Sequence, residues 1–187
     1  MRYQTPAALE MAAKAATRQS ALDMSRAMTG FYFHRLLCRI FSDPHHAFVL
    51  KGGQSMLART VDARATKDID LLCNERSLER ALEELKRLAS VDLGDYMRFT
   101  LASADPIKVE DEYRSGLRVV FQPTLGPKSL QPIAIDLVVD EVPLESAELV
   151  TPADRIEVEG LPVCDYLVYP VENALADKLC ALVERHD

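Results

Sequence analysis

The sequence has no long hydrophobic run, no CxxC motif and no excess of positive charge. Its longest apolar runs are far shorter than the roughly 20 residues that cross a bilayer. The N-terminus also lacks the apolar centre of a signal peptide, so we expect no membrane segment and a cytoplasmic protein. The cysteines are Cys38, Cys73, Cys164 and Cys180, and they are not spaced with the histidines as in a zinc site. We expect reduced thiols that pack as small apolar groups.

The charge balance opposes general attraction to nucleic acid or anionic membranes. Lysine and arginine number 22 against 29 acidic residues, which gives a formal charge of −7. A role in RNA binding would therefore need a local basic surface or metal ions. Of the 187 residues, 48% are apolar, which is enough to build the core of one domain.

The order of the expected elements is helix first, then strand–helix–strand–helix, then further strands. Thr5-Pro6 predicts a helix start, and the helix should continue to about Met28, before Gly30 breaks it. A second helix is expected over 31–41. Strands are expected at 47–50, 68–73, 97–101, 117–121 and 132–139, with helices directly after the first strand and at 77–88. We expect a loop over 123–132, irregular chain over 143–165 and a last helix over 171–185.

The first expected strand runs into Gly52-Gly53 and then a helix. Free backbone N–H groups at a helix N-terminus, without side chains in the way, can bind a phosphate. Two glycines by themselves favour the simpler alternative, a plain tight turn. Lys51 likewise fits a phosphate contact or a solvated lysine at a strand end.

Asp68 and Asp70 are two residues apart on an expected strand, so both side chains point to one face, with Cα atoms about 7 Å apart. Two such carboxylates can converge on a divalent ion, and Mg²⁺ favours these ligands while keeping positions open for phosphates. The alternative is a pair of solvated acids on an edge strand. Ile69, Leu71 and Leu72 make the segment look buried and favour the metal site.

Asp136 is a lone charge in the apolar strand "PIAIDLVV". An unpaired buried carboxylate costs several kcal/mol, so Asp136 needs a cation, strong hydrogen bonds or an exposed cleft position. Pairing with an arginine is the alternative to a metal role.

The last expected helix carries a lysine inside an apolar stripe. Val171, Leu175, Leu179 and Leu182 share one face, and Lys178 falls in the middle of it. A lysine directed from a packed helix at phosphate or at the acids explains this position. A stem that lies along the apolar surface while the charge reaches water is the alternative.

The segments "LKGG", "RATKDID", "IDL" and "ENALADKLCAL" resemble the AbiEii/AbiGii abortive-infection toxins of the DNA polymerase β-like nucleotidyltransferase superfamily. The resemblance runs from about Phe31 to the end. It implies an α+β fold, a mixed sheet with helices, in a single domain: a helical lead-in over 1–45, a catalytic core over 46–150 and a C-terminal helical segment over 151–187. Members of the family continue beyond "ALVER", so we expect a further functional segment to be missing after Asp187.

The resemblance also implies roles for individual residues. Two Mg²⁺ ions would be held by Asp68, Asp70 and Asp136, with Lys178 as a further catalytic residue. The nucleoside triphosphate would contact Lys51, Gly52, Gly53, Ser55, Arg64, Thr66 and Lys178.

The implied function is transfer of a nucleotidyl group to RNA, at the 3′ end of tRNA, by a growth-arresting toxin that a separate antitoxin neutralises. Two alternatives stay open: the same chemistry on a small molecule, which the charge of −7 favours, and a non-catalytic binding protein on the same fold. If RNA is bound, basic residues must gather at one side of the cleft. The candidates are Arg59, Arg64, Lys67, Arg114 and Arg118.

Overall fold

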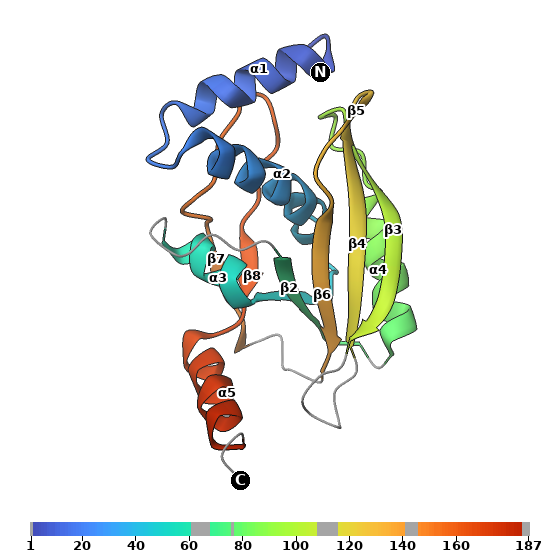
Figure 1. Ribbon diagram of the computed structural model, residues 1–187, viewed down its shortest axis with the longest axis vertical. Coiled ribbons are helices and arrows are strands. Elements are labelled where there is room, and N and C mark those ends of the chain that lie inside the picture. The colour runs from blue at the N-terminus through green and yellow to red at the C-terminus, as the bar shows by residue number, and fades with distance from the viewer. Residues whose placement is uncertain (1, 61–67, 76, 108–115, 141–145, 185–187) are drawn as a thin grey trace.

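The computed structural model describes residues 2–60, 68–75, 77–107, 116–140 and 146–184, with backbone alone at 57, 177, 178 and 180–184. It is an α+β structure with helices packed against one mixed sheet (Figure 1). Helix α1 (Pro6–Thr17) and the N-terminus lie at one end of the molecule, and helix α5 (Val171–Glu184) lies at the other end.

The N-terminal helices divide earlier than the sequence predicted. Helix α2 spans Met24–Phe41, so Gly30 lies inside a helix and does not end one, and the predicted boundary was wrong. The reason is the cap at Asp23, whose side chain accepts a hydrogen bond from the N–H of Arg26 at 3.0 Å. Such a cap stabilises a helix start by about 1 kcal/mol, similar to the cost of a glycine in the helix interior. The predicted cap at Thr5 is confirmed, since its hydroxyl accepts from the N–H of Ala8 at 3.1 Å.

The sheet has the strand order β3-β4-β6-β2-β1-β8-β7, and β5 pairs with β4. Strand β2 is parallel to β6 and β1 is parallel to β8, while the other pairs are antiparallel. Helix α3 (Gly52–Arg59) joins β1 to β2, and α4 (Leu78–Ala89) follows β2. The strands are β1 (Phe48–Lys51), β2 (Asp68–Cys73), β3 (Met97–Ile107), β4 (Gly116–Leu125), β5 (Lys128–Ser129), β6 (Ile133–Val139), β7 (Glu148–Val150) and β8 (Tyr166–Val168).

The two segments predicted to lack regular structure contain short strands. Residues 123–132 include the end of β4 and all of β5, which form a hairpin around Gly126 and Pro127. Strand β7 lies within 143–165 and pairs with β8. Sequence patterns miss such strands because two or three residues are too few to show a period of two.

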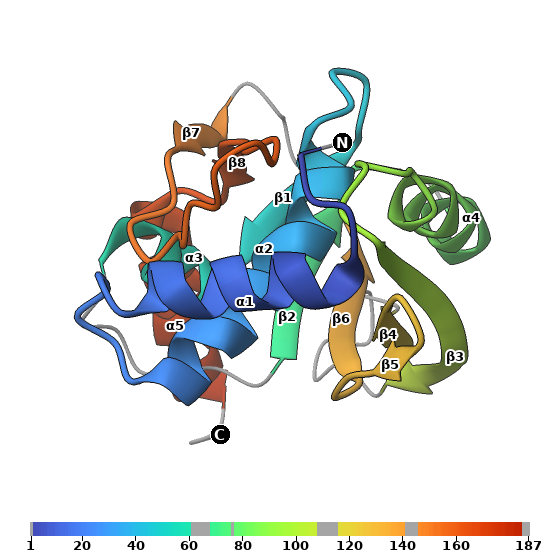
Figure 2. The same ribbon diagram turned by 90° about the horizontal axis from the view of Figure 1, so that it is seen from above.

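One face of the sheet belongs to the main core. Ile69, Ile135, Leu137 and Val119 from the central strands are fully buried, in one cluster with apolar residues of α2 and α4. The strand β6 alternation predicted from sequence is confirmed, because Asp136 lies on the opposite, partly exposed face. Figure 2 shows α1 and α2 on one side of the strands and α4 beside β3.

A charged cluster lies inside this core. Arg35 and Arg39 of α2 are 1% exposed, and both bind Asp95, which is fully buried. Arg35 Nε donates to Asp95 Oδ2 at 2.7 Å, and Arg39 Nη2 donates to Oδ1 at 2.7 Å. Arg39 also donates to the carbonyl of Met97 at 3.0 Å. The cluster therefore ties α2 to the start of β3.

Helix α5 differs from the packed helix that was predicted. Leu175 and Leu179 of its apolar stripe are 56% and 63% exposed, so in the described part of the chain this stripe is not buried. Figure 1 shows the reason, since α5 extends away from the sheet.

Cys38 and Cys73 are buried free thiols, as expected, and Cys164 is a partly buried free thiol. In the part of the chain that the structure describes, no helix combines the length and the apolar character needed to cross a bilayer.

Candidate active site

A row of charged residues crosses five adjacent strands on the partly exposed face of the sheet. Asp70 of β2 lies opposite Asp136 of β6 on one side and opposite Lys51 of β1 on the other. Asp136 in turn lies opposite Arg118 of β4, and Arg118 lies opposite Asp105 of β3. Residues directly opposite each other on neighbouring strands share a face. The register therefore brings together the predicted acids from two segments far apart in sequence.

Arg118 binds two of these acids directly. Its Nη1 donates to Asp136 Oδ1 at 3.0 Å and Oδ2 at 3.2 Å, and its Nη2 donates to Asp68 Oδ1 at 2.9 Å. The side chains of Arg118, Asp68 and Asp136 are 42%, 39% and 27% exposed. The arginine pairing considered for Asp136 from sequence is thus present, and one guanidinium spans both carboxylates.

Asp70 is partly buried and is affected by the charges of the other two acids. Burial raises the pKa of Asp70 above its usual range, and the charges of Asp136 and Asp68 raise it further, while a hydrogen bond from the N–H of Gly53 and the charge of Lys51 oppose the rise. The ionised carboxylate is therefore destabilised by its surroundings. A cation beside Asp70 would relieve this cost.

The glycine turn lies directly against Asp70. Gly52 has a φ of +63°, and a Cβ at this position would stand 1.8 Å from Asp70 Oδ2, so only glycine fits there. Ser55, which is buried, donates from its hydroxyl to the carbonyl of Gly52 at 2.7 Å. Lys51 Nζ lies 4.2 Å from the centre of the Tyr169 ring. The start of α3 thus lies directly beside the three acids Asp68, Asp70 and Asp136, which we call the acid row.

The donor set fits a hard divalent cation in its chemistry. Three carboxylates lie on one face, and a positive group already bridges two of them. Oxygen ligands of this kind suit Mg²⁺. Among the described residues, however, no group of three or more His, Cys, Asp or Glu side chains is arranged to hold a metal ion, and the guanidinium of Arg118 lies between Asp68 and Asp136.

Three predicted site residues cannot be placed by the structure. Arg64 and Thr66 lie outside the described residues, as does Lys67 of the predicted basic surface. Lys178 belongs to α5, but its side chain lies outside the described part.

Sequence reasoning considered Arg118 only as a contact for RNA and missed its place between the acids. The available signal was a lone charge in the apolar strand segment "LRVVF", which matches the lone Asp136 in "PIAIDLVV". Arg59, another predicted RNA contact, pairs with Glu148 at 2.7 Å.

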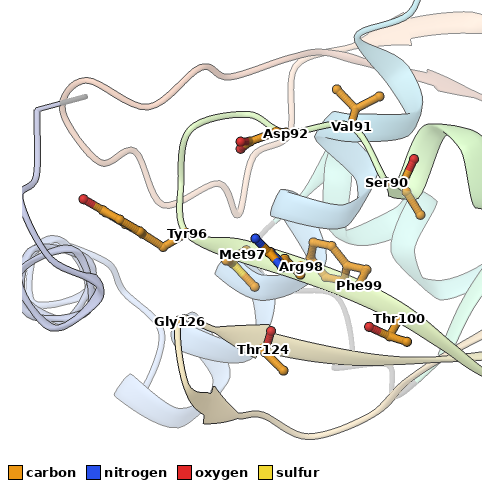
Figure 3. Close-up of a pocket in the computed structure, with 11 residues that line it drawn as sticks. Ser90, Val91, Asp92, Tyr96, Met97, Arg98, Phe99, Thr100, Thr124 and Gly126 are labelled. Carbon is orange, nitrogen blue, oxygen red and sulfur yellow. The ribbon is translucent and has the colours of Figure 1, made fainter.

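A separate open pocket lies on the far part of β3 and β4 (Figure 3). Its lining includes Arg98, Thr100 and Thr124 from the strands and Ser90 and Asp92 from the segment after α4. It contains none of the predicted site residues. The pocket and the predicted acids therefore lie in different parts of the structure.

The fold is similar to that of a nucleotidyltransferase toxin of known structure. MenT4, a nucleotidyltransferase toxin from Mycobacterium tuberculosis, matches 91% of this chain with a TM-score of 0.55 and 18% sequence identity. JHP933 from Helicobacter pylori matches 83% of the chain with a TM-score of 0.48 and 17% identity. This chain covers 57% of each of those chains, so it spans little more than half their length.

A family model described as "Nucleotidyl transferase AbiEii toxin, Type IV TA system" matches residues 35–187. This is most of the chain, and the protein belongs to the AbiEii family of nucleotidyltransferase toxins. No curated protein sequence matches the chain significantly.

Proposed function

We propose that this protein is a magnesium-dependent toxin that transfers a nucleotidyl group from a nucleoside triphosphate to the 3′ end of a tRNA. The observation that carries the proposal is the acid row beside the glycine turn, in which Asp70 lies opposite Asp136 and against Gly52. Membership of the AbiEii family supports the type of reaction. In this reaction the acceptor hydroxyl oxygen bonds to the α-phosphorus, and pyrophosphate leaves.

Each group at the site has a proposed part. Asp68, Asp70 and Asp136 would hold two Mg²⁺ ions, which stabilise negative charge on the attacking and leaving oxygens. A carboxylate oxygen of Asp136 orients the acceptor hydroxyl and takes its proton. Backbone N–H groups at the start of α3 would bind triphosphate oxygens, because the positive end of the helix dipole lies there. The N–H of Gly53 would exchange its hydrogen bond to Asp70 for one to a phosphate oxygen.

The triphosphate-binding set comprises residues of the turn and residues outside it. Gly52 and Gly53 leave room for the phosphates, and Ser55 holds the turn through the Gly52 carbonyl. The remaining members of this proposed set are Lys51, Arg64, Thr66 and Lys178.

The direct test is incubation of the protein with tRNA, Mg²⁺ and one labelled nucleoside triphosphate at a time. We expect label at the tRNA 3′ end from one or more nucleotides, and none from the Asp136→Asn variant. Nucleotide binding without transfer to any acceptor would favour a non-catalytic binding protein and overturn the proposal.

Lys178 can be tested separately from the fold. Lys178→Met keeps an apolar stem and removes the charge, so it separates the two predicted roles. We expect normal folding, with a higher triphosphate requirement or lower turnover. Normal nucleotide dependence would assign Lys178 to the surface of α5.

A small-molecule acceptor is the second candidate. The charge of −7 favours it, and both described arginines of the predicted RNA surface, Arg59 and Arg118, form ion pairs within the chain. Salt dependence distinguishes the two acceptors. For single-stranded RNA, the logarithm of the binding constant falls against the logarithm of the salt concentration with a slope of about −0.7 for each phosphate contact. A flat salt response without tRNA labelling would favour the small molecule.

The biological role proposed is growth arrest in the cytoplasm, prevented by a separately encoded antitoxin. The type IV toxin–antitoxin description of the family supports this role. Expression of the chain should stop growth, and co-expression of the neighbouring gene should restore it. Growth that is unaffected by an active enzyme would contradict the toxin role but not the chemistry.

A further inference from the structure

Arg118 occupies the space that a cation shared by Asp68 and Asp136 would need. Its two terminal nitrogens reach different carboxylates, at 2.9 Å for Asp68 and at 3.0 and 3.2 Å for Asp136. Both oxygens of Asp136 are engaged by one nitrogen. Both oxygens of Asp136 and one oxygen of Asp68, its diagonal neighbour on β2, are thus already bound to a positive group.

A guanidinium and a divalent ion compete for these same oxygens. Each carboxylate oxygen offers two lone pairs, but the two cations would also repel each other at close range. Metal binding to the acids is therefore tighter when the guanidinium leaves.

The surroundings of Arg118 allow it to leave. Its side chain is 42% exposed, so movement does not require repacking of the core. Asp105 of β3 lies opposite Arg118 on the side away from Asp136. Side chains at such cross-strand positions can reach each other, so the displaced guanidinium has a second carboxylate nearby.

We propose that Arg118 is an internal counter-cation of the acid row that a divalent metal displaces. The two carboxylates of Asp68 and Asp136 then bind either Arg118 or the metal. Arg118 is a positioning residue that sets how tightly the metal binds. The inference rests on the proposed metal-binding role of these acids and adds a competing group to it. Once released, the guanidinium lies at the edge of the site with its donors available.

The test measures metal binding and stability rather than turnover. The full chain without nucleotide is titrated with Mn²⁺ by electron paramagnetic resonance and with Mg²⁺ by calorimetry. We expect Arg118→Gln to bind the metal about tenfold more tightly than the wild type, as expected for removal of one partly exposed competing pair. The metal-free variant should also melt at a lower temperature, because three acids then face fewer positive charges.

Matched variants separate competition from general charge effects. Arg98→Gln removes the same charge from β3. Arg98 lies opposite Thr124, which is six residues from Arg118 along β4, so the two arginines are roughly 20 Å apart. Arg98→Gln should leave metal affinity almost unchanged. Arg118→Lys keeps the charge but loses the two-pronged contact, and its affinity should fall between those of wild type and Arg118→Gln. This conservative variant also serves if Arg118→Gln does not fold.

The outcomes distinguish this inference from the proposed function. Equal or weaker metal binding by both Arg118 variants, with binding abolished by Asp68→Asn, would overturn the exchange and leave the metal site standing. Absence of metal binding in wild type and in both variants would overturn the exchange and the metal site together. If Arg98→Gln increased metal affinity over the wild type as much as Arg118→Gln does, the effect would be due to net charge, and the exchange would be overturned.

Discussion

Gly52 approaches Asp70 so closely that a Cβ on residue 52 would stand 1.8 Å from the Asp70 carboxylate. We therefore expect Gly52→Ala to lower the free energy of unfolding by about 1–3 kcal/mol, because the methyl group must displace Asp70 and the φ of residue 52 is strained for alanine. Transfer activity should fall with it. Urea unfolding and the tRNA-labelling assay measure the two effects.

The control for this change is Gly30→Ala. Gly30 lies inside α2. A Cβ at this position would lie 3.8 Å from Asp154 Oδ2, which is an ordinary contact. We expect a gain of about 0.5–1 kcal/mol, since alanine favours a helix interior. Equal stability of the Gly52→Ala variant and the wild type would contradict the close approach.

Replacement of Asp70 should stabilise the metal-free protein. The pKa of Asp70 is raised by burial and by Asp136 and Asp68, so the ionised form opposes folding at neutral pH. The wild type is therefore most stable, as far as Asp70 is concerned, when this carboxyl is neutral. Stability is lost as pH rises from about 3.9, the pKa in the unfolded chain, through the raised pKa of the folded state. We expect Asp70→Asn to raise the melting temperature at pH 7 by about 2–4 °C, for a gain on the order of 1 kcal/mol.

The gain from Asp70→Asn should shrink near pH 4, where the wild-type carboxyl is also neutral. The same variant should lose tRNA labelling, because it removes a proposed metal ligand. Full activity of Asp70→Asn with Mg²⁺ is incompatible with this assignment. So is a gain in melting temperature over the wild type that is smaller at pH 7 than at pH 4.

Asp95 is expected to be among the most important residues for stability. Its carboxylate is the shared partner of the buried Arg35 and Arg39, so Asp95→Asn leaves two guanidinium groups buried without a counter-charge. Such a change costs about 3–5 kcal/mol. The matched change Glu148→Gln removes the partly exposed pair with Arg59 and should cost less than about 1 kcal/mol. Similar losses in urea unfolding would refute the distinction.

His34 should make the protein sensitive to mild acid. It is 4% exposed, with Nδ1 hydrogen-bonded to the Tyr166 hydroxyl. Burial, together with the charges of Arg35 and Arg155, lowers the pKa of His34 to about 3. The unfolded chain titrates near 6.5, so between about pH 6.5 and 3 it binds more protons, and stability falls as pH falls, by up to about 1.4 kcal/mol per pH unit.

His34→Gln keeps a hydrogen-bonding side chain and removes the titration. The difference in melting temperature between pH 7 and pH 4.5 should therefore be smaller in this variant than in the wild type. His45→Gln, at an exposed position, should retain the wild-type difference. A pH response that is unchanged in His34→Gln would show that other groups produce it.

The sequence by itself determined the local elements around the site. The alternation in "PIAIDLVV", the strand "DIDLLC" and the glycine turn after "FVLK" place acids and turn on recognisable elements, because periodicity and glycine content act over a few residues. The α+β fold and the AbiEii family also followed from these motifs. Local patterns did not fix the start of α2, where capping by Asp23 outweighed the glycine at position 30.

Only the tertiary structure decided which charges meet. Asp70 and Asp136 are 66 residues apart, and their pairing depends on the register between parallel strands β2 and β6. The same holds for Arg118 with Asp68 and Asp136, and for the arginines of α2 with Asp95. A charged residue shows in sequence that a partner is needed, but long-range strand pairing and packing select that partner.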